Sequence, residues 1–298
     1  MDRVSLQRPI LSSTRADRRL EGAGFPVRRP FPSAALDHLD PFLLLDEMGP
    51  RAWGPREAIG APDHPHRGFE TVTYLLQGTM QHRDSQGNEG LLKPGDVQWM
   101  TAGAGIVHSE MPEEKFFDVG GVLHGFQLWI NLPRARKMMA PRYQDIAATR
   151  IPVARDEEEG IEVRVIAGTC LGKTAVIDTV LPISYLHLGL QPGASLSQPI
   201  PEVQHGFIFV FEGSVEAGTP PTPIPDGVLG RFGPGDEVTI RAGKAGAQAL
   251  LIAGTPLGEP VARYGPFVMS TRAELEQAFA DFQQGRMGSI KATMSHGR

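Results

Sequence analysis

The chain has 298 residues, and its 29 basic and 34 acidic side chains give a net charge of -5. Sequence-independent binding of nucleic acid needs a concentrated basic face, so this balance argues against direct nucleic-acid binding. Residues 1–20 lack the apolar stretch of a secretory signal, and no segment approaches the roughly eighteen apolar residues of a membrane span. A single cysteine, Cys170, excludes an intramolecular disulfide and fits a reducing compartment, so we expect a cytoplasmic protein.

The 35 glycines and 26 prolines are spread between short apolar runs. This pattern predicts many short strands joined by turns, and helical periodicity is scarce. An acidic run, Asp156 to Glu159, precedes Gly160 and is expected to be a solvated loop between two halves of the chain. We therefore expect an N-terminal domain over residues 1–155 and a C-terminal domain over residues 156–298.

Two short motifs in the first half carry the chemistry, His64-Pro65-His66 and His108-Ser109-Glu110. On a strand, residues i and i+2 point to the same face, so each motif presents two donors together. Three imidazoles and one carboxylate make a chelating set for a divalent first-row transition metal. Singly, each side chain fits a polar strand face exposed to solvent. As a spaced set, the four favour a metal site in the N-terminal domain.

Other residues of the first half leave alternatives open. Glu70 is an even number of residues from His64 and His66, so its side chain should point inward with theirs. There it could contact the substrate, accept a hydrogen bond from a metal ligand, or form a plain salt bridge. His82 fits a hairpin surface, and His124 fits the mouth or core of a barrel, with a role in the site as the alternative for each. Arg67 could be a cation at the rim of a cavity, although a surface ion pair is favoured, and Phe69 is expected in the core.

The second half repeats the pattern of the first without its donors. The Pro-Gly-Asp turn at residues 94–96, with its following strand and Ala-Gly, recurs at residues 234–236, which indicates a duplicated β domain. So many short strands in each copy favour a closed barrel or a double-sheet jelly roll. Aligning the copies sets Gln248 and Leu250 opposite His108 and Glu110, so the second copy is expected to hold no metal. The Pro-rich segment Gly218 to Gly230 is expected to be a mobile loop.

The last predicted element is a helix. Thr271-Arg-Ala-Glu274 has the form of a capping box, and Leu275 and Phe279 follow on one face. The helix should end near Gly285.

With these motifs in place, the chain resembles the pirin family. The resemblance is carried by residues 63–74 (Asp-His-Pro-His-Arg-Gly-Phe-Glu-Thr-Val-Thr-Tyr), 94–103, 105–110, 127–133 and 265–269, in order along the chain. It implies an all-β protein of two cupin barrels (jelly-roll, double-stranded β-helix) in tandem, with a short C-terminal helix. It also implies one mononuclear Fe(II) in the N-terminal barrel, with His64, His66, His108 and Glu110 as ligands. Nickel, manganese, copper or zinc would suit the same donors.

The resemblance further implies a dioxygenase that opens flavonols such as quercetin with O₂ and releases carbon monoxide. Glu110 would then be the general base for the 3-hydroxyl group. The alternative is an iron-dependent, redox-sensing regulator that binds a partner protein without turnover, and a third possibility is a metal that only stabilises the barrel. Two fused barrels favour a monomer.

Overall fold

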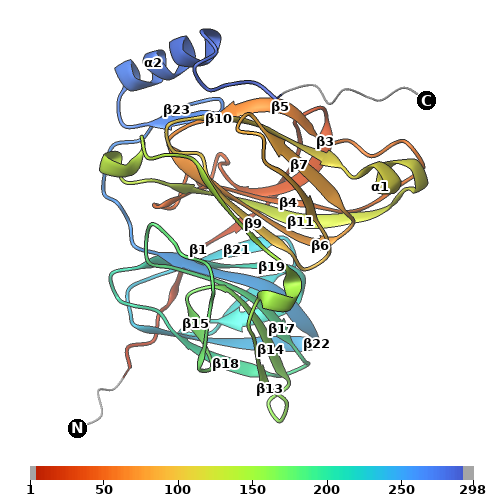
Figure 1. Cartoon of the computed structure of the whole chain (residues 1–298). Helices are drawn as coiled ribbons and strands as arrows, with labels where there is room; N and C mark the ends of the chain where they lie inside the picture. The colour runs from red at the N-terminus through yellow and green to blue at the C-terminus, as the bar shows by residue number, and fades with distance from the viewer. Residues whose placement is uncertain (1–4, 291–298) are drawn as a thin grey trace. The chain divides into compact units, whose positions relative to one another are not determined.

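The computed structural model describes residues 5–290, and β-strands dominate it (Figure 1). The strands are β1 (Ile10–Arg15), β2 (Asp17–Glu21), β3 (Phe25–Phe31), β4 (Phe42–Trp53), β5 (Ala61–His66), β6 (Phe69–Gln77), β7 (Met80–Asp84), β8 (Glu89–Leu92), β9 (Val97–Thr101), β10 (Ile106–Pro112), β11 (Gly121–Asn131), β12 (Arg142–Ile146), β13 (Val153–Asp156), β14 (Ile161–Ala167), β15 (Thr169–Cys170), β16 (Lys173–Thr174), β17 (Ile183–Leu190), β18 (Ser195–Pro199), β19 (His205–Ala217), β20 (Thr222–Pro225), β21 (Val228–Phe232), β22 (Glu237–Gly254), β23 (Ala262–Tyr264) and β24 (Phe267–Met269). The helices are α1 (Glu114–Val119) and α2 (Arg272–Gln283), with 3₁₀ turns at Arg134–Arg136 and Ala148–Arg150. None of the helices in this part of the chain is long and apolar enough to cross a membrane.

The described chain divides into two compact units. The histidine unit comprises residues 19–27, 47–148 and 258–290, and the second unit comprises residues 5–18, 28–46 and 149–257. Neither unit is contiguous in sequence, because residues 5–18 and 28–46 belong to the second unit and residues 258–290 to the histidine unit. Strand β1 pairs with β21, which brings the N-terminal segment into the second unit. Arg67 bridges in parallel to Phe267, which brings the C-terminal segment into the histidine unit.

The second unit is built on one nine-stranded sheet, in the order β1-β21-β19-β22-β17-β14-β13, with β18 on β22 and β20 on β19. Strands β19 and β22 are long and pair along two stretches, separated by irregularities between Val210 and Val215 that let the sheet bend. Inward side chains at alternate positions form an apolar core, for example Leu186, Leu188 and Leu251.

The segment Gly218 to Gly230 is not the loop that the sequence predicted. It contains β20 and the start of β21, both of which pair with β19. Its prolines lie at the edge of the sheet, where a missing backbone donor is tolerated, and Ile224 is fully buried. The alternation of apolar and polar residues there was masked by the high proline content.

The histidine unit contains a four-stranded sheet, β5-β10-β7-β8, and strands of a seven-stranded sheet, β12-β9-β6-β11-β4-β3-β2. The chain passes from the first sheet to the second at Gly68, which separates β5 from β6. Gly68 has a φ of +88°, and a Cβ at this position would lie 2.0 Å from the carbonyl oxygen of Val268. Only glycine fits this crossing, because both the backbone conformation and the close approach exclude a side chain.

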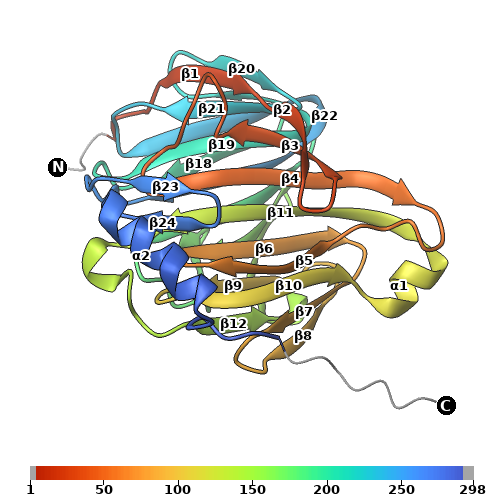
Figure 2. The ribbon, with the colours of Figure 1, turned by 90° about the horizontal axis from the view of Figure 1, so that it is seen from above.

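The C-terminal helix α2 begins and ends as the sequence predicts. Thr271 caps it and forms a capping box with Glu274, and the helix ends at Gln283, two residues before Gly285. Its buried residues Leu275 and Ala278 pack in a cluster with Phe267. Figure 2 shows α2 lying alongside the hairpin of β23 and β24. The prediction of an all-β fold with a short C-terminal helix is confirmed.

Candidate metal centre

Three of the four predicted donors converge in the histidine unit. His64 and His66 lie on β5, and His108 lies directly opposite His64 on the antiparallel strand β10. The ring centroids are 4.7 Å apart for His64 and His66, 4.3 Å for His64 and His108, and 4.9 Å for His66 and His108. One nitrogen from each ring falls within 4.8 Å of the other two. The i, i+2 spacing and the cross-strand register therefore create a compact group of three nitrogen donors.

Hydrogen bonds orient two of these rings. Nδ1 of His64 lies 2.7 Å from the carbonyl oxygen of Pro62, and Nδ1 of His66 lies 3.4 Å from that of Pro266. A carbonyl accepts only from a protonated nitrogen, so both rings carry the proton on Nδ1 and keep the lone pair of Nε2 available. This tautomer is the one that a metal-binding histidine needs.

Burial keeps the inner histidines neutral. Burial, and then the neighbouring His64, lowers the pKa of His66 well below its ordinary value. Burial, followed by the other histidines of the group, does the same for the pKa of His108. Both ring nitrogens of His108 are buried and have no hydrogen-bond partner in the described chain. Unpaired buried nitrogens are costly, and coordination of a cation would satisfy one of them, so the group fits a metal ion.

Glu110, the fourth predicted donor, stands apart from this compact group. It follows His108 on β10 beyond a register irregularity between the two residues, and it is half-buried. Oε1 of its carboxylate lies 2.8 Å from the hydroxyl of Thr73, and Oε2 lies 3.5 Å from the side-chain nitrogen of Gln127. Two side chains of the seven-stranded sheet therefore hold the carboxylate, outside the group of three histidines.

The sequence analysis misplaced Glu70. The carboxylate of Glu70 accepts a 2.6 Å hydrogen bond from Thr101, whereas Thr73, three residues on, contacts Glu110. Residues of even and odd number on β6 point to opposite faces, so Glu70 points away from the face that carries Thr73. The parity argument failed because the crossing at Gly68 separates His66 and Glu70 into strands of different sheets.

The same crossing changes the surroundings of Phe69 and Arg67. Phe69 is buried as predicted, but its ring lies 5.0 Å from that of His66 and 4.4 Å from that of Trp129, beside the histidines. Arg67 is buried rather than on the surface, and it forms an ion pair with Asp281 of α2. Phe69 and Trp129 give His66 an aromatic flank.

Sequence reasoning also placed His82 wrongly, and it did not consider Tyr143. His82 lies on β7, is 2% exposed, and has its ring centroid 5.4 Å from that of His108 and 4.8 Å from that of Tyr143. Burial lowers the pKa of His82, so its ring is neutral. Burial, followed by the negative charge of Asp84, raises the pKa of Tyr143, so its hydroxyl remains protonated. Met80, His82 and Asp84 are buried at alternate positions of β7, whereas Gln81 and Arg83 are half-buried.

His124 lies away from these residues. Its side chain is buried, which agrees with the core position that the sequence offered beside the barrel mouth. Its Nε2 lies 3.0 Å from the carboxylate of Glu47. In the described part of the second unit, no group of three histidine, cysteine or acidic side chains could hold a metal.

Comparisons with known proteins agree with this architecture. The Pirin family model matches residues 24–130, and the model for the Pirin C-terminal cupin domain matches residues 185–288. The chain therefore belongs to the pirin family. Pirin-like protein 2 of Arabidopsis thaliana is 44% identical over 290 residues, which cover 95% of this chain and 86% of that protein. Human pirin is 44% identical over 281 residues, which cover 91% of each chain.

A solved structure supports the same conclusion for the fold. The crystal structure of a quercetin 2,3-dioxygenase from Acinetobacter baumannii matches this pirin with a TM-score of 0.89 and 38% identity. The match covers 95% of this chain and 99% of that structure. The predicted pair of cupin domains is thereby confirmed.

Proposed function

We propose that this pirin is an Fe(II)-dependent dioxygenase that opens flavonols such as quercetin, with His64, His66, His108 and Glu110 as the metal ligands. The convergence of three imidazoles, with the carboxylate of Glu110 on the same strand as His108, is the observation that carries this proposal. Such a donor set suits iron and leaves positions for exogenous ligands. The similarity to a solved quercetin 2,3-dioxygenase supports the choice of substrate class.

When bound, the metal would supply Lewis-acid activation of the flavonol and one-electron chemistry with dioxygen. The chain supplies the arrangement around it. The carbonyls of Pro62 and Pro266 hold His64 and His66 in the tautomer that presents Nε2. Trp129, which is half-buried and packed against the buried Phe69, offers an apolar flank for a flat aromatic ring.

In this proposal Glu110 takes the proton of the flavonol 3-hydroxyl group. A general base must be anionic and lie within hydrogen-bond reach of the proton that it removes. The hydroxyl of Thr73 fixes the carboxylate through Oε1, and the amide of Gln127 lies nearer to Oε2. Oε2 has the longer contact and is therefore the oxygen better able to accept the substrate proton.

The test combines metal analysis with oxygen uptake. Protein purified without chelator and loaded with Fe(II) under argon should consume O₂ and release carbon monoxide with quercetin. His108→Ala should lose most of the bound metal, and Glu110→Gln should lose oxygen uptake. His38→Ala is the matched control, because His38 is exposed and distant in sequence from the cluster.

Two results would reject the proposal. One is iron-loaded protein that consumes no oxygen with any flavonol. The other is a Glu110→Gln variant with unchanged uptake. Iron-loaded protein that lacked turnover but bound a partner protein in only one oxidation state would instead support the regulatory alternative.

We also propose a cytoplasmic location. Cys170 is buried and free, which suits a reducing compartment. Cell fractionation tests this location, and recovery of the protein outside the cytoplasm would contradict it.

A further inference from the structure

His82 and Tyr143 are buried polar residues that the proposed chemistry does not use. Neither ring nitrogen of His82 has a hydrogen-bond partner in the described chain, and neither does the hydroxyl of Tyr143. The two rings lie side by side, and the ring of His82 is 5.4 Å from that of His108. Their unpaired atoms therefore gather next to the innermost metal-binding histidine.

A neighbouring carboxylate, Asp84, is bonded elsewhere. Asp84 lies two residues after His82 on β7, but its oxygens are engaged in the turn that follows. Oδ1 accepts from the backbone of Gln86 at 2.8 Å and of Asn88 at 2.9 Å, and Oδ2 accepts from the side chain of Asn88 at 2.7 Å. Asp84 thus closes the hairpin, and the hydroxyl of Tyr143, although close to this carboxylate, makes no hydrogen bond of good geometry with it.

A purely structural role for this pair is unfavourable. Buried polar groups nearly always have a partner, and an unpaired buried donor costs far more than an apolar side chain of similar shape. Leucine and phenylalanine would fill the same volume without that cost. The pair is better explained by a polar group that comes from outside the chain.

We propose that His82 and Tyr143 bind one oxygen of a ligand whose neighbouring oxygen is held at the histidine cluster. The inference rests on the proposed function and deepens it, because it names two residues that would bind the second oxygen of the substrate. The ligand is then an aromatic molecule with two adjacent oxygens, such as the hydroxyl beside a carbonyl of a flavonol.

The chemistry of the pair fits this class. A neutral imidazole and a phenol each offer one hydrogen-bond donor, and both can converge on a carbonyl or phenolate oxygen. The pair lies beside His108, whereas the aromatic residues Phe69 and Trp129 lie beside His66. Hydrogen-bond donors for a ligand oxygen therefore lie next to His108, and apolar side chains for a ligand ring lie next to His66.

The test measures binding without turnover. The full-length protein is loaded with Fe(II) under argon and titrated with 3-hydroxyflavone, which carries a hydroxyl beside a carbonyl, and the absorption of the ligand reports its Kd. Tyr143→Phe and His82→Leu each remove a donor, and His82→Gln keeps one. Tyr264→Phe is the matched control, because Tyr264 is 70% exposed. Metal content is measured for every variant.

Tyr143→Phe and His82→Leu should each bind 3-hydroxyflavone about threefold to tenfold more weakly, as expected for one lost hydrogen bond. His82→Gln should recover part of the loss, Tyr264→Phe should match the wild type, and metal content should stay unchanged. Tyr143→Phe alone decides the matter if His82→Leu does not fold.

The inference is overturned if Tyr143→Phe binds as tightly as the wild type. It is also overturned if either variant loses metal as His108→Ala does, because the pair would then support the metal and not the ligand. Failure of the proposed function is a different result. In that case the variants would differ in anaerobic binding, but the wild type would consume no oxygen when air is admitted.

Discussion

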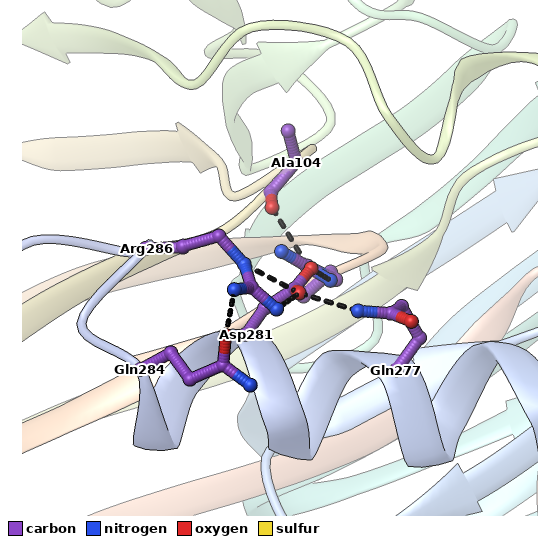
Figure 3. Close-up of polar contacts among 6 residues, drawn as sticks. Ala104, Gln277, Asp281, Gln284 and Arg286 are labelled. Carbon is purple, nitrogen blue, oxygen red and sulfur yellow. Dashed lines mark hydrogen bonds and ion pairs between the residues drawn. The ribbon is translucent and has the colours of Figure 1, made fainter.

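Arg67 and Asp281 form a buried ion pair in the histidine unit, with 2.6 Å between Nη1 and Oδ2 and side chains that are 5% and 12% exposed. Arg67 follows His66 of the histidine cluster and also donates from Nε to the carbonyl of Ala104, 2.7 Å away. Figure 3 shows Asp281 of α2 receiving further bonds from Gln277 and Arg286. The pair therefore connects the end of β5, the loop before β10 and the C-terminal helix.

Removing one partner of this pair should be costly. Asp281→Ala leaves the buried guanidinium of Arg67 without its counter-charge, and such losses destabilise proteins by about 3–5 kcal/mol. Urea unfolding measures the loss. Glu276→Ala is the matched control on the same helix, since its pair with Arg272 is exposed and should contribute less than about 1 kcal/mol. Equal effects of the two substitutions would contradict the structural role of the buried pair.

The same pair predicts an acid dependence of stability. Hydrogen bonds from Arg67, then Arg286 and Gln277, hold the pKa of Asp281 well below its ordinary value. A carboxyl group whose pKa is lower in the folded state stabilises the fold above its unfolded pKa and loses that contribution as the pH falls toward its folded pKa. Between about pH 5 and about pH 2, the free energy of unfolding of the wild type should therefore fall more steeply than that of Asp281→Asn. If the free energies of unfolding of the two proteins changed with pH in parallel, Asp281 would not contribute to the acid dependence of stability.

Gly68 should tolerate no side chain at the crossing between the two sheets. Gly68→Ala places a Cβ 2.0 Å from the carbonyl oxygen of Val268 at a φ of +88°. We expect a loss of more than about 3 kcal/mol, from strain and displaced backbone together. Gly87→Ala is the control, because Gly87 has a φ of +89° but no atom within 4 Å of the added Cβ, so only about 1 kcal/mol of strain is expected. Thermal unfolding of the two variants separates the effects, and similar Tm values would argue against the close approach.

Cys170 should be unreactive in the folded protein. It is 3% exposed, and burial raises the pKa of its thiol to about 11. The thiolate is the reactive form, so very little of it exists at neutral pH. An aromatic disulfide reagent at about pH 8 should label Cys170 only after denaturant is added. Rapid labelling of the native protein would contradict the burial.

The sequence predicted those features that depend on short-range periodicity. The i, i+2 spacing of His64 and His66 and the capping box at Thr271 needed only local geometry, and both appear as expected. Glu70 was misplaced because Gly68 transfers the chain between sheets, and a parity count across that position loses its meaning. The burial of Arg67 depends on Asp281, which is more than two hundred residues away in the sequence. His82 was missed because its burial depends on strands β10 and β12, which are distant in sequence.

The exchange of terminal segments has a consequence for biosynthesis. Residues 258–290 complete the histidine unit, and β1 completes the second unit. During translation, the carboxylate that neutralises Arg67 emerges from the ribosome only after the whole second unit has been made. No single cut in the polypeptide separates the two units, and the histidine cluster remains without its closing helix until residues 272–283 have been made.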